Sequence, residues 1–319
     1  MTACSYDRRT LGAAAFTVAA SLMLPRRPVR GDGLLTLQTA EIADGIFVSE
    51  GVHELNSATN GGHIANVSFV VGSNGVAVID TGGSAAVGRG LRQAIRRVTD
   101  KPIRYIINTH MHPDHVMGNA ALLEIDTQVV GHAKLPRGLA ARGDRYLAQS
   151  KAELSPSAFE GSRIVLPTRL VDETTMLNLG GRTLTLVARK TAHTDNDLTI
   201  RDSLTDTVFL GDLLFSAHIP TLDGSIKGWL QVLDQIRVET AARVVPGHGP
   251  ASMPWPEAMA AEAVYLETVA RDVRALIKHA GTLGEAMSTA AVSEKSQWLL
   301  ADEFHARTVA AAFAELEWE

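Results

Sequence analysis

The sequence predicts an α/β protein in which strands and helices alternate in two halves around two layers of sheet. Two hairpins, one in each half, have typical turn residues between apolar runs: Ser73-Asn74-Gly75 within 66–79, and Gly180-Gly181 within 176–187. Helical patterns lie at about 84–98, 116–124, 133–148 and 228–239. This alternation is what a layered α/β domain requires.

Further apolar runs predict the remaining strands at 103–107, 198–200, 207–210 and 243–245. Residues 255–317 have a helical pattern throughout, with breaks near Gly281 and Gly284. We expect this C-terminal part to pack against the second sheet.

Seven side chains that can donate a lone pair to a metal stand where strands end or in the loops that follow. They are His110, His112, Asp114 and His115 in THMHPDH, His193 in TAHTDND, Asp212 in FLGD, and His248 in PGHG. Imidazole and carboxylate ligands suit zinc, iron or manganese. The pattern therefore predicts a metal site.

The first segment indicates how the ligands divide. It follows the buried strand 103–107 as a loop, and helix signals resume only at Val116. Alternate residues of an extended loop point to one side, so His110 and His112 can bind one ion while Asp114 and His115 face a second. The remaining ligands complete the sets: His193 on the first ion, His248 on the second, and Asp212 as a bridge between them.

The ligand order H-x-H-x-D-H, H, D, H resembles the metallo-β-lactamase superfamily over roughly residues 40–280. The resemblance implies a four-layer αβ/βα sandwich with a dinuclear site at one edge of its sheets. It also implies that Asp80, in the segment Asp80-Thr81-Gly82-Gly83, orients a ligating histidine. The alternative is that Asp80 only caps the helix that starts near Ala85.

Asp212 separates subgroups of this superfamily. The best-known zinc β-lactamases carry a cysteine there, which disfavours a β-lactamase. The flavo-diiron members have a glutamate where His112 stands and a flavodoxin-like half that this sequence lacks. Several longer segments resemble the zinc metallohydrolases associated with quinoprotein relay systems: VMGNAALLE, VVGHAKLPRGLAARGDRYL, LDGSIKGWL and the ending ELEWE.

The N-terminus predicts export. Arg8-Arg9 precede an apolar stretch that is too short to span a bilayer stably, and the pair resembles a twin-arginine signal. We expect a signal peptide over 1–30, a metallo-β-lactamase-like domain over 31–254 and a helical extension over 255–319, in the periplasm and without a stable membrane span once the signal is removed. An uncleaved anchor is the alternative. Cys4, the single cysteine, lies in the signal, so no disulfide is expected.

Charge disfavours a nucleic-acid partner. The chain carries a net charge of −5, and residues 1–30 hold five arginines against one aspartate, so the remainder is near −9. No Lys/Arg cluster that could follow a phosphate backbone occurs outside the signal. A small-molecule substrate is expected, and the sequence does not set the oligomeric state.

The predicted function is a dinuclear zinc hydrolase in which a metal-bridging hydroxide attacks an ester, thioester or lactone carbonyl. Asp114 is expected to pass a proton to the leaving group. His132 and His218 follow strands and are candidate substrate contacts, with purely structural roles as the alternative. Two other functions stay open: a mononuclear iron oxygenase like the persulfide dioxygenases, and a metal-binding accessory protein without turnover in a quinoprotein system.

Overall fold

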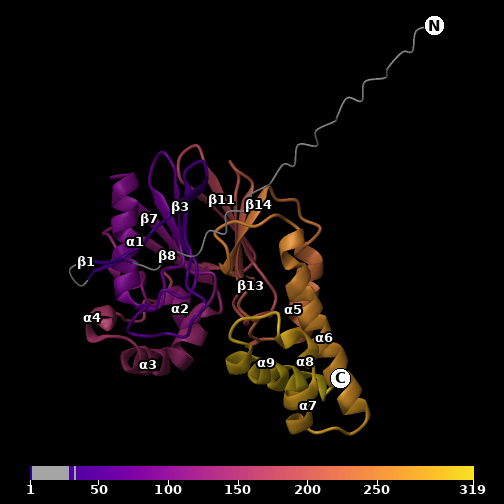
Figure 1. The fold of residues 1–319 in the computed structure, drawn as a ribbon. Coiled ribbons are helices and arrows are strands. Elements are labelled where there is room, and N and C mark those ends of the chain that lie inside the picture. The colour runs from indigo at the N-terminus through magenta and orange to yellow at the C-terminus, as the bar shows by residue number, and fades with distance from the viewer. Residues whose placement is uncertain (2–28, 32–33) are drawn as a thin grey trace.

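The computed structural model describes residue 1, residues 29–31 and residues 34–319. It has two facing sheets with helices on both outer faces, which confirms the four-layer sandwich (Figure 1). The predicted export signal falls almost wholly on residues 2–28, outside the described residues. In the part of the chain that is described, no helix has both the length and the apolar character that a membrane crossing needs.

The first sheet has seven strands in the order of the sequence. Its strands are β3 (Ala40–Ala43), β4 (Ile46–Ser49), β5 (Val67–Val71), β6 (Val76–Ile79), β7 (Ile103–Ile107), β8 (Gln128–His132) and β9 (Arg169–Val171). The strands from β3 to β6 pair antiparallel, and those from β6 to β9 pair parallel. The carboxyl ends of β6, β7 and β8 therefore lie at one edge of the sheet.

The second sheet has five strands. They are β10 (Thr174–Asn178), β11 (Thr183–Ala188), β12 (Leu198–Asp202), β13 (Thr207–Phe215) and β14 (Arg243–His248). Only β13 and β14 pair parallel. A separate ribbon is formed by β1 (Val29–Gly31) and β2 (Leu34–Thr36).

Helices flank both sheets. In the first half they are α1 (Ala85–Val98), α2 (Pro113–Val116), the 3₁₀ helix η1 (Asn119–Leu122), α3 (Leu135–Glu153) and α4 (Pro156–Phe159). In the second half they are α5 (Ile226–Ile236), η2 (Glu257–Met259), α6 (Ala260–Lys278), α7 (Leu283–Thr289), α8 (Val292–Lys295) and α9 (Ala301–Leu316).

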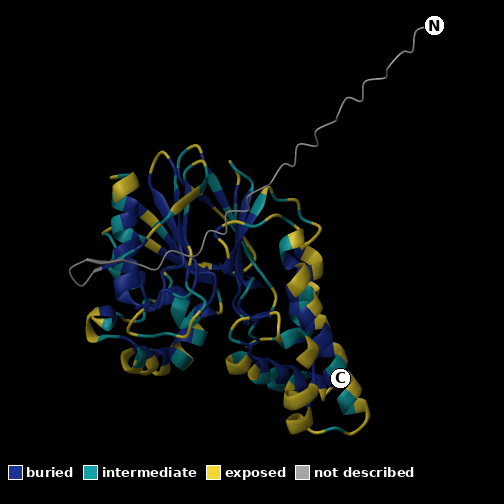
Figure 2. Ribbon diagram, in the orientation of Figure 1, coloured by how far each residue is buried: buried dark blue, intermediate teal, exposed yellow. Residues whose placement is uncertain are grey.

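Alternation along the strands builds three apolar layers. Val76 and Val78 of β6 face α1, whereas Ala77 and Ile79 face the second sheet. A third layer joins β13 and β14 to α5, α6 and α9, so the C-terminal helices share a core with the second sheet. Figure 2 shows these layers as the buried interior. Each fully buried large aliphatic side chain contributes about 1.5–3 kcal/mol to stability.

Two sequence expectations near the ligands were wrong in detail. The helix after the first ligand segment begins at Pro113 rather than Val116, because proline at the first helical position already has a helical φ. Asp212 lies inside β13 rather than after it, since pairing with β14 resumes beyond an irregularity at Gly211.

Candidate metal centre

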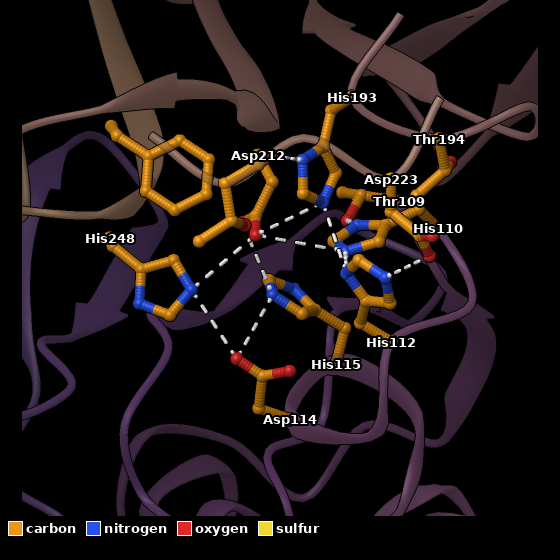
Figure 3. A network of polar contacts seen from close by, with 12 residues as sticks. Thr109, His110, His112, Asp114, His115, His193, Thr194, Asp212, Asp223 and His248 are labelled. Atoms are coloured by element: carbon orange, nitrogen blue, oxygen red, sulfur yellow. Dashed lines mark hydrogen bonds and ion pairs between the residues drawn. The ribbon is translucent and has the colours of Figure 1, made fainter. Parts of the chain in front are cut away.

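The first ligand group comes from three elements. His110 and His112 follow β7, His193 lies between β11 and β12, and Asp212 comes from β13. Nδ1 of His112 lies 3.1 Å from Nε2 of His110 and 3.0 Å from Nε2 of His193. Three imidazole nitrogens thus converge on one point (Figure 3). The arrangement matches a three-histidine metal position.

The second group contains Asp114, His115 and His248. Oδ2 of Asp114 lies 3.3 Å from Nε2 of His248 and 3.5 Å from Nε2 of His115. The first two residues belong to α2, and the third ends β14. Each group therefore combines residues from both halves of the chain.

Asp212 stands between the two groups (Figure 3). Its Oδ1 lies 3.2 Å from Nε2 of His115, and its Oδ2 lies 3.4 Å from His248 and 3.5 Å from His193. Gly247 makes room for this carboxylate, because a Cβ there would lie 1.9 Å from Oδ1 of Asp212. The position suits a bridging ligand.

All five histidines have their outer ring nitrogen held by a protein oxygen. The partners are Thr109 Oγ1 for His110 (3.1 Å), Asp223 Oδ2 for His112 (2.9 Å), Asp80 Oδ2 for His115 (2.8 Å), Thr221 O for His193 (2.7 Å) and Ile64 O for His248 (3.0 Å). Such partners fix the tautomer and the direction of the remaining lone pair. Each ring is set to present that lone pair to an ion.

Asp80 anchors the second group. Its carboxylate accepts hydrogen bonds from the backbone N–H of Thr109 at 2.8 Å and from its hydroxyl at 2.7 Å, besides facing His115. The helix-cap alternative is wrong, since Ser84 caps α1 through the N–H of Val87. Asp80 has a φ of 55°, a left-handed conformation that aspartate tolerates better than most residues.

Asp223 supports His112 and was missed in the sequence. It lies in the loop before α5, inside the segment LDGSIKGWL, but was assigned no role at the metal site from the sequence. Arg142 of α3 forms an ion pair with the same oxygen that faces His112. Burial raises the pKa of Asp223, but the hydrogen bonds from His112 and Arg142 outweigh it and keep the carboxyl ionised.

The two groups differ in charge. Burial lowers the pKa of His193 to about 4 and also lowers that of His110, so both are neutral at pH 7. Burial lowers the pKa of His248 as well, but Asp212 and Asp114 raise it to about 9. The carboxylates thus concentrate negative charge on the second group, where a divalent ion would neutralise it.

The residues fit a pair of metal ions. Nε2 of His115 and Oδ1 of Asp212 are buried and make no hydrogen bond with any described residue. Leaving such atoms unsatisfied costs about 1–3 kcal/mol each. A cation bound between them would satisfy both atoms, and zinc accepts this combination of nitrogen and oxygen ligands.

A cavity of about 730 Å³ opens over the site. His112, Asp114, Asp212 and His248 line it, together with residues of α3 and α9. The C-terminal helices therefore not only pack on the second sheet but also form one wall of the cavity. Sequence spacing could not show this second role.

The two candidate substrate-contacting histidines differ in position. His218 lines the cavity, and its ring lies 4.8 Å from that of His248. His132 is the last residue of β8 and does not line the cavity; its Nδ1 accepts a hydrogen bond from the N–H of Lys134 at 3.0 Å. The geometry therefore favours the structural role for His132.

The sequence profile described as "Metallo-beta-lactamase superfamily" matches residues 60–248, a range that contains all seven ligands. The chain belongs to the metallo-beta-lactamase superfamily. The two assembled His/Asp groups lie within this matched range and are arranged as a metal-binding site.

Several known proteins are similar to this chain. The linear primary-alkylsulfatase of Pseudomonas sp. (strain ATCC 19151) is 34% identical over 61 residues, which are 19% of this chain and 12% of that protein. The structure of the stereoselective inverting sec-alkylsulfatase of Pseudomonas sp. matches with a TM-score of 0.67 and 14% identity, covering 87% of this chain and 50% of that one. The structure of a metallo-beta-lactamase from Pontibacter korlensis matches with a TM-score of 0.58 and 18% identity, covering 73% of this chain and 99% of that one.

These structural similarities show a common fold. The chain spans about half the length of the sec-alkylsulfatase and a smaller part of the linear primary-alkylsulfatase. The activities of those whole proteins are therefore hypotheses for this one.

Proposed function

We propose that this protein is a dinuclear zinc hydrolase that cleaves an ester, thioester or lactone carbonyl. The observation that carries the proposal is Asp212, whose two oxygens face ligands of both metal groups at 3.2–3.5 Å. The cavity over this carboxylate is large enough for a small organic substrate.

Zinc ions in the two groups would polarise the scissile carbonyl and lower the pKa of a shared water toward neutrality. Asp114 is 14% exposed in its side chain and lines the cavity, whereas His115 is buried. Burial raises the pKa of Asp114, but His115 and His248 outweigh it, so the group is a carboxylate at pH 7. Asp114 can accept a proton there and pass it to a leaving group.

The test is turnover of p-nitrophenyl esters, a thioester and a lactone by the purified zinc-loaded protein. We expect hydrolysis of at least one class and its loss in Asp212→Asn, which keeps the shape but removes the charge between the groups. Hydrolysis that survives in Asp212→Asn, or no turnover of any carbonyl substrate by the zinc-loaded protein, would overturn the proposal.

Sulfate ester hydrolysis is a second candidate, because both the local sequence match and the broadest fold match named above are to alkylsulfatases. A primary and a secondary alkyl sulfate, measured beside the carboxylic esters, separate the two reactions. Sulfate release without ester cleavage would assign the protein to the sulfatases.

The metal content separates hydrolase from oxygenase. Both ligand groups are assembled, which supports close to two zinc ions per chain after purification without added metal. One equivalent of iron with no zinc, measured by elemental analysis, would favour a mononuclear oxygenase. Two zinc ions without turnover of any activated ester would favour an accessory protein.

We also propose that the protein acts in the periplasm, with a quinoprotein oxidation pathway as its setting. The support is the sequence around Arg8-Arg9 and the segments resembling quinoprotein-associated hydrolases. Cell fractionation with N-terminal sequencing tests the location. Full-length protein in the cytosol would exclude it.

A further inference from the structure

Two arginines that line the cavity have no acidic partner among the described residues. Arg145 belongs to α3 and Arg307 to α9, and both are exposed. Among the arginines from residue 89 onward, only these two and two others, Arg163 and Arg169, have a side chain without a hydrogen bond or ion pair to a protein oxygen. Half of the free guanidinium groups therefore lie at one cavity.

Three glutamates line the same cavity as the two arginines. Of the three glutamates that line it, Glu54 accepts a hydrogen bond from Asn60 and Glu153 accepts one from Gln149. Glu303, one turn before Arg307 on α9, forms no ion pair with a described residue. The amides of Asn60 and Gln149 are neutral, so all three carboxylates keep their charge, and Arg145 and Arg307 are the arginines without an ion pair in the described cavity lining.

Both arginines lie near residues that contact the metal centre. Arg142 is bound to Asp223 beside the ligand His112, and Arg145 is three residues, about 4.5 Å, further along α3. On α9, the ring of Phe304 lies 5.2 Å from that of His218, and the guanidinium carbon of Arg307 lies 5.9 Å from the Phe304 ring.

Apolar side chains also line the cavity. Leu55, Ile64 and Leu222 line the same cavity as Phe304. A substrate that reaches from the metal centre to the arginines would therefore contact apolar side chains of the cavity, Phe304 among them, and end at positive charge.

We propose that Arg145 and Arg307 bind an oxyanion group at the end of the substrate remote from the scissile bond. This inference rests on the proposed ester hydrolysis and names its substrate class: an ester with an apolar body and a carboxylate, sulfonate or phosphate end. The planar guanidinium fork donates two parallel hydrogen bonds to each of these groups.

The test compares p-nitrophenyl hexanoate with its analogues that end in a carboxylate, a sulfonate or a phosphonate. We expect at least one anionic ester to have a lower KM than p-nitrophenyl hexanoate. Arg145→Gln and Arg307→Gln should each lower kcat/KM for that ester about tenfold, the factor of one charge-assisted hydrogen bond, and leave the neutral ester unchanged. Arg163→Gln removes an exposed, unpaired charge outside the cavity and is the matched control.

Binding provides a readout that does not need turnover. Hexanoate and adipate share one carboxylate that the metal centre can hold, so calorimetry on the zinc-loaded protein isolates the second carboxylate. We expect adipate to bind more tightly, and the difference to shrink in both arginine variants but not in Arg163→Gln. Sulfonate- and phosphonate-ended analogues of adipate identify the preferred group.

The outcomes separate the two proposals. If no ester is hydrolysed but adipate still gains affinity through the arginines, the hydrolysis proposal fails and the anion site stands. If anionic and neutral esters lose activity equally in the variants, or if adipate and hexanoate bind equally to the unaltered protein, the anion site is refuted.

Discussion

Replacing Asp223 by asparagine should weaken metal binding at the first ligand group. The carboxylate is 2.9 Å from Nε2 of His112, and it is the only hydrogen-bond partner of that nitrogen within the described structure. Asparagine keeps the shape but removes the negative charge that raises the basicity of the ligand. It also leaves Arg142 facing the imidazole without its counter-charge.

The magnitude depends on burial. Loss of a partner that orients a ligand typically weakens metal binding about 10- to 100-fold, or about 1.4–2.7 kcal/mol. The Asp223 side chain is 33% exposed, so water can replace part of its interaction, and we expect a loss near tenfold. The Asp80 side chain is only 3% exposed, so water cannot replace its interaction with His115. The loss of metal affinity at the second group in Asp80→Asn should therefore approach about 100-fold.

The assay is competition between the protein and a chelator of known zinc affinity, which yields two stepwise dissociation constants. Asp206→Asn is the control, because it removes an aspartate paired with Arg201 that does not line the cavity. Arg142→Ala should have a smaller effect than Asp223→Asn, since His112 retains its partner. The reasoning is refuted if Asp223→Asn leaves both constants unchanged or weakens only the site that Asp80→Asn weakens.

Four further changes test the site and its support. Asp212→Ala should release both ions in elemental analysis and abolish hydrolysis, because it removes the charge between two cations. Gly247→Ala should act similarly, as its Cβ would lie 1.9 Å from the Asp212 carboxylate; Gly181→Ala, with no atom within 4 Å, should leave metal content intact. Burial raises the pKa of Glu262 well above its usual 4.5, so the unfolded state releases its proton first and stability falls as pH rises above 4.5. Glu262→Gln should therefore raise stability at pH 7 by about 1–3 kcal/mol and remove that pH dependence in urea titrations. Chelation of the metals should lower Tm, because ions that bind only the folded state stabilise it.

The strands that carry the ligands were predictable because they are continuous apolar runs. The 103–107 run became β7 with the predicted bounds, and both glycine-containing turns join hairpin strands. By contrast, β3 and β9 were not predicted. Each has three or four residues and is partly exposed at a sheet edge, so its sequence shows no clear alternation of apolar and polar residues. These strands form because they pair with a neighbouring strand.

The ligands could be found in the sequence because histidine and aspartate at such spacing are rare by chance. The residues that hold these ligands in place could not be found in the same way. Asp223 and Arg142 are 81 residues apart, and nothing in the sequence around either residue indicates that the two meet beside a ligand. The same holds for Arg307, whose place on the cavity wall depends on how α9 packs against the second sheet.

The metal centre depends on the contact between the two halves of the chain. Each ligand group takes residues from both, so ligand spacing is set by the apolar layer between the sheets. Asn66 secures this contact beside the site: its side-chain amide donates to the carbonyls of Pro246 and Gly249, which flank His248. The N–H of Leu198 bonds the carbonyl of Thr109 in the same way across the sheets. A close-packed interface of this kind tolerates little displacement, which explains how five imidazoles from both halves of the chain can converge before any ion binds.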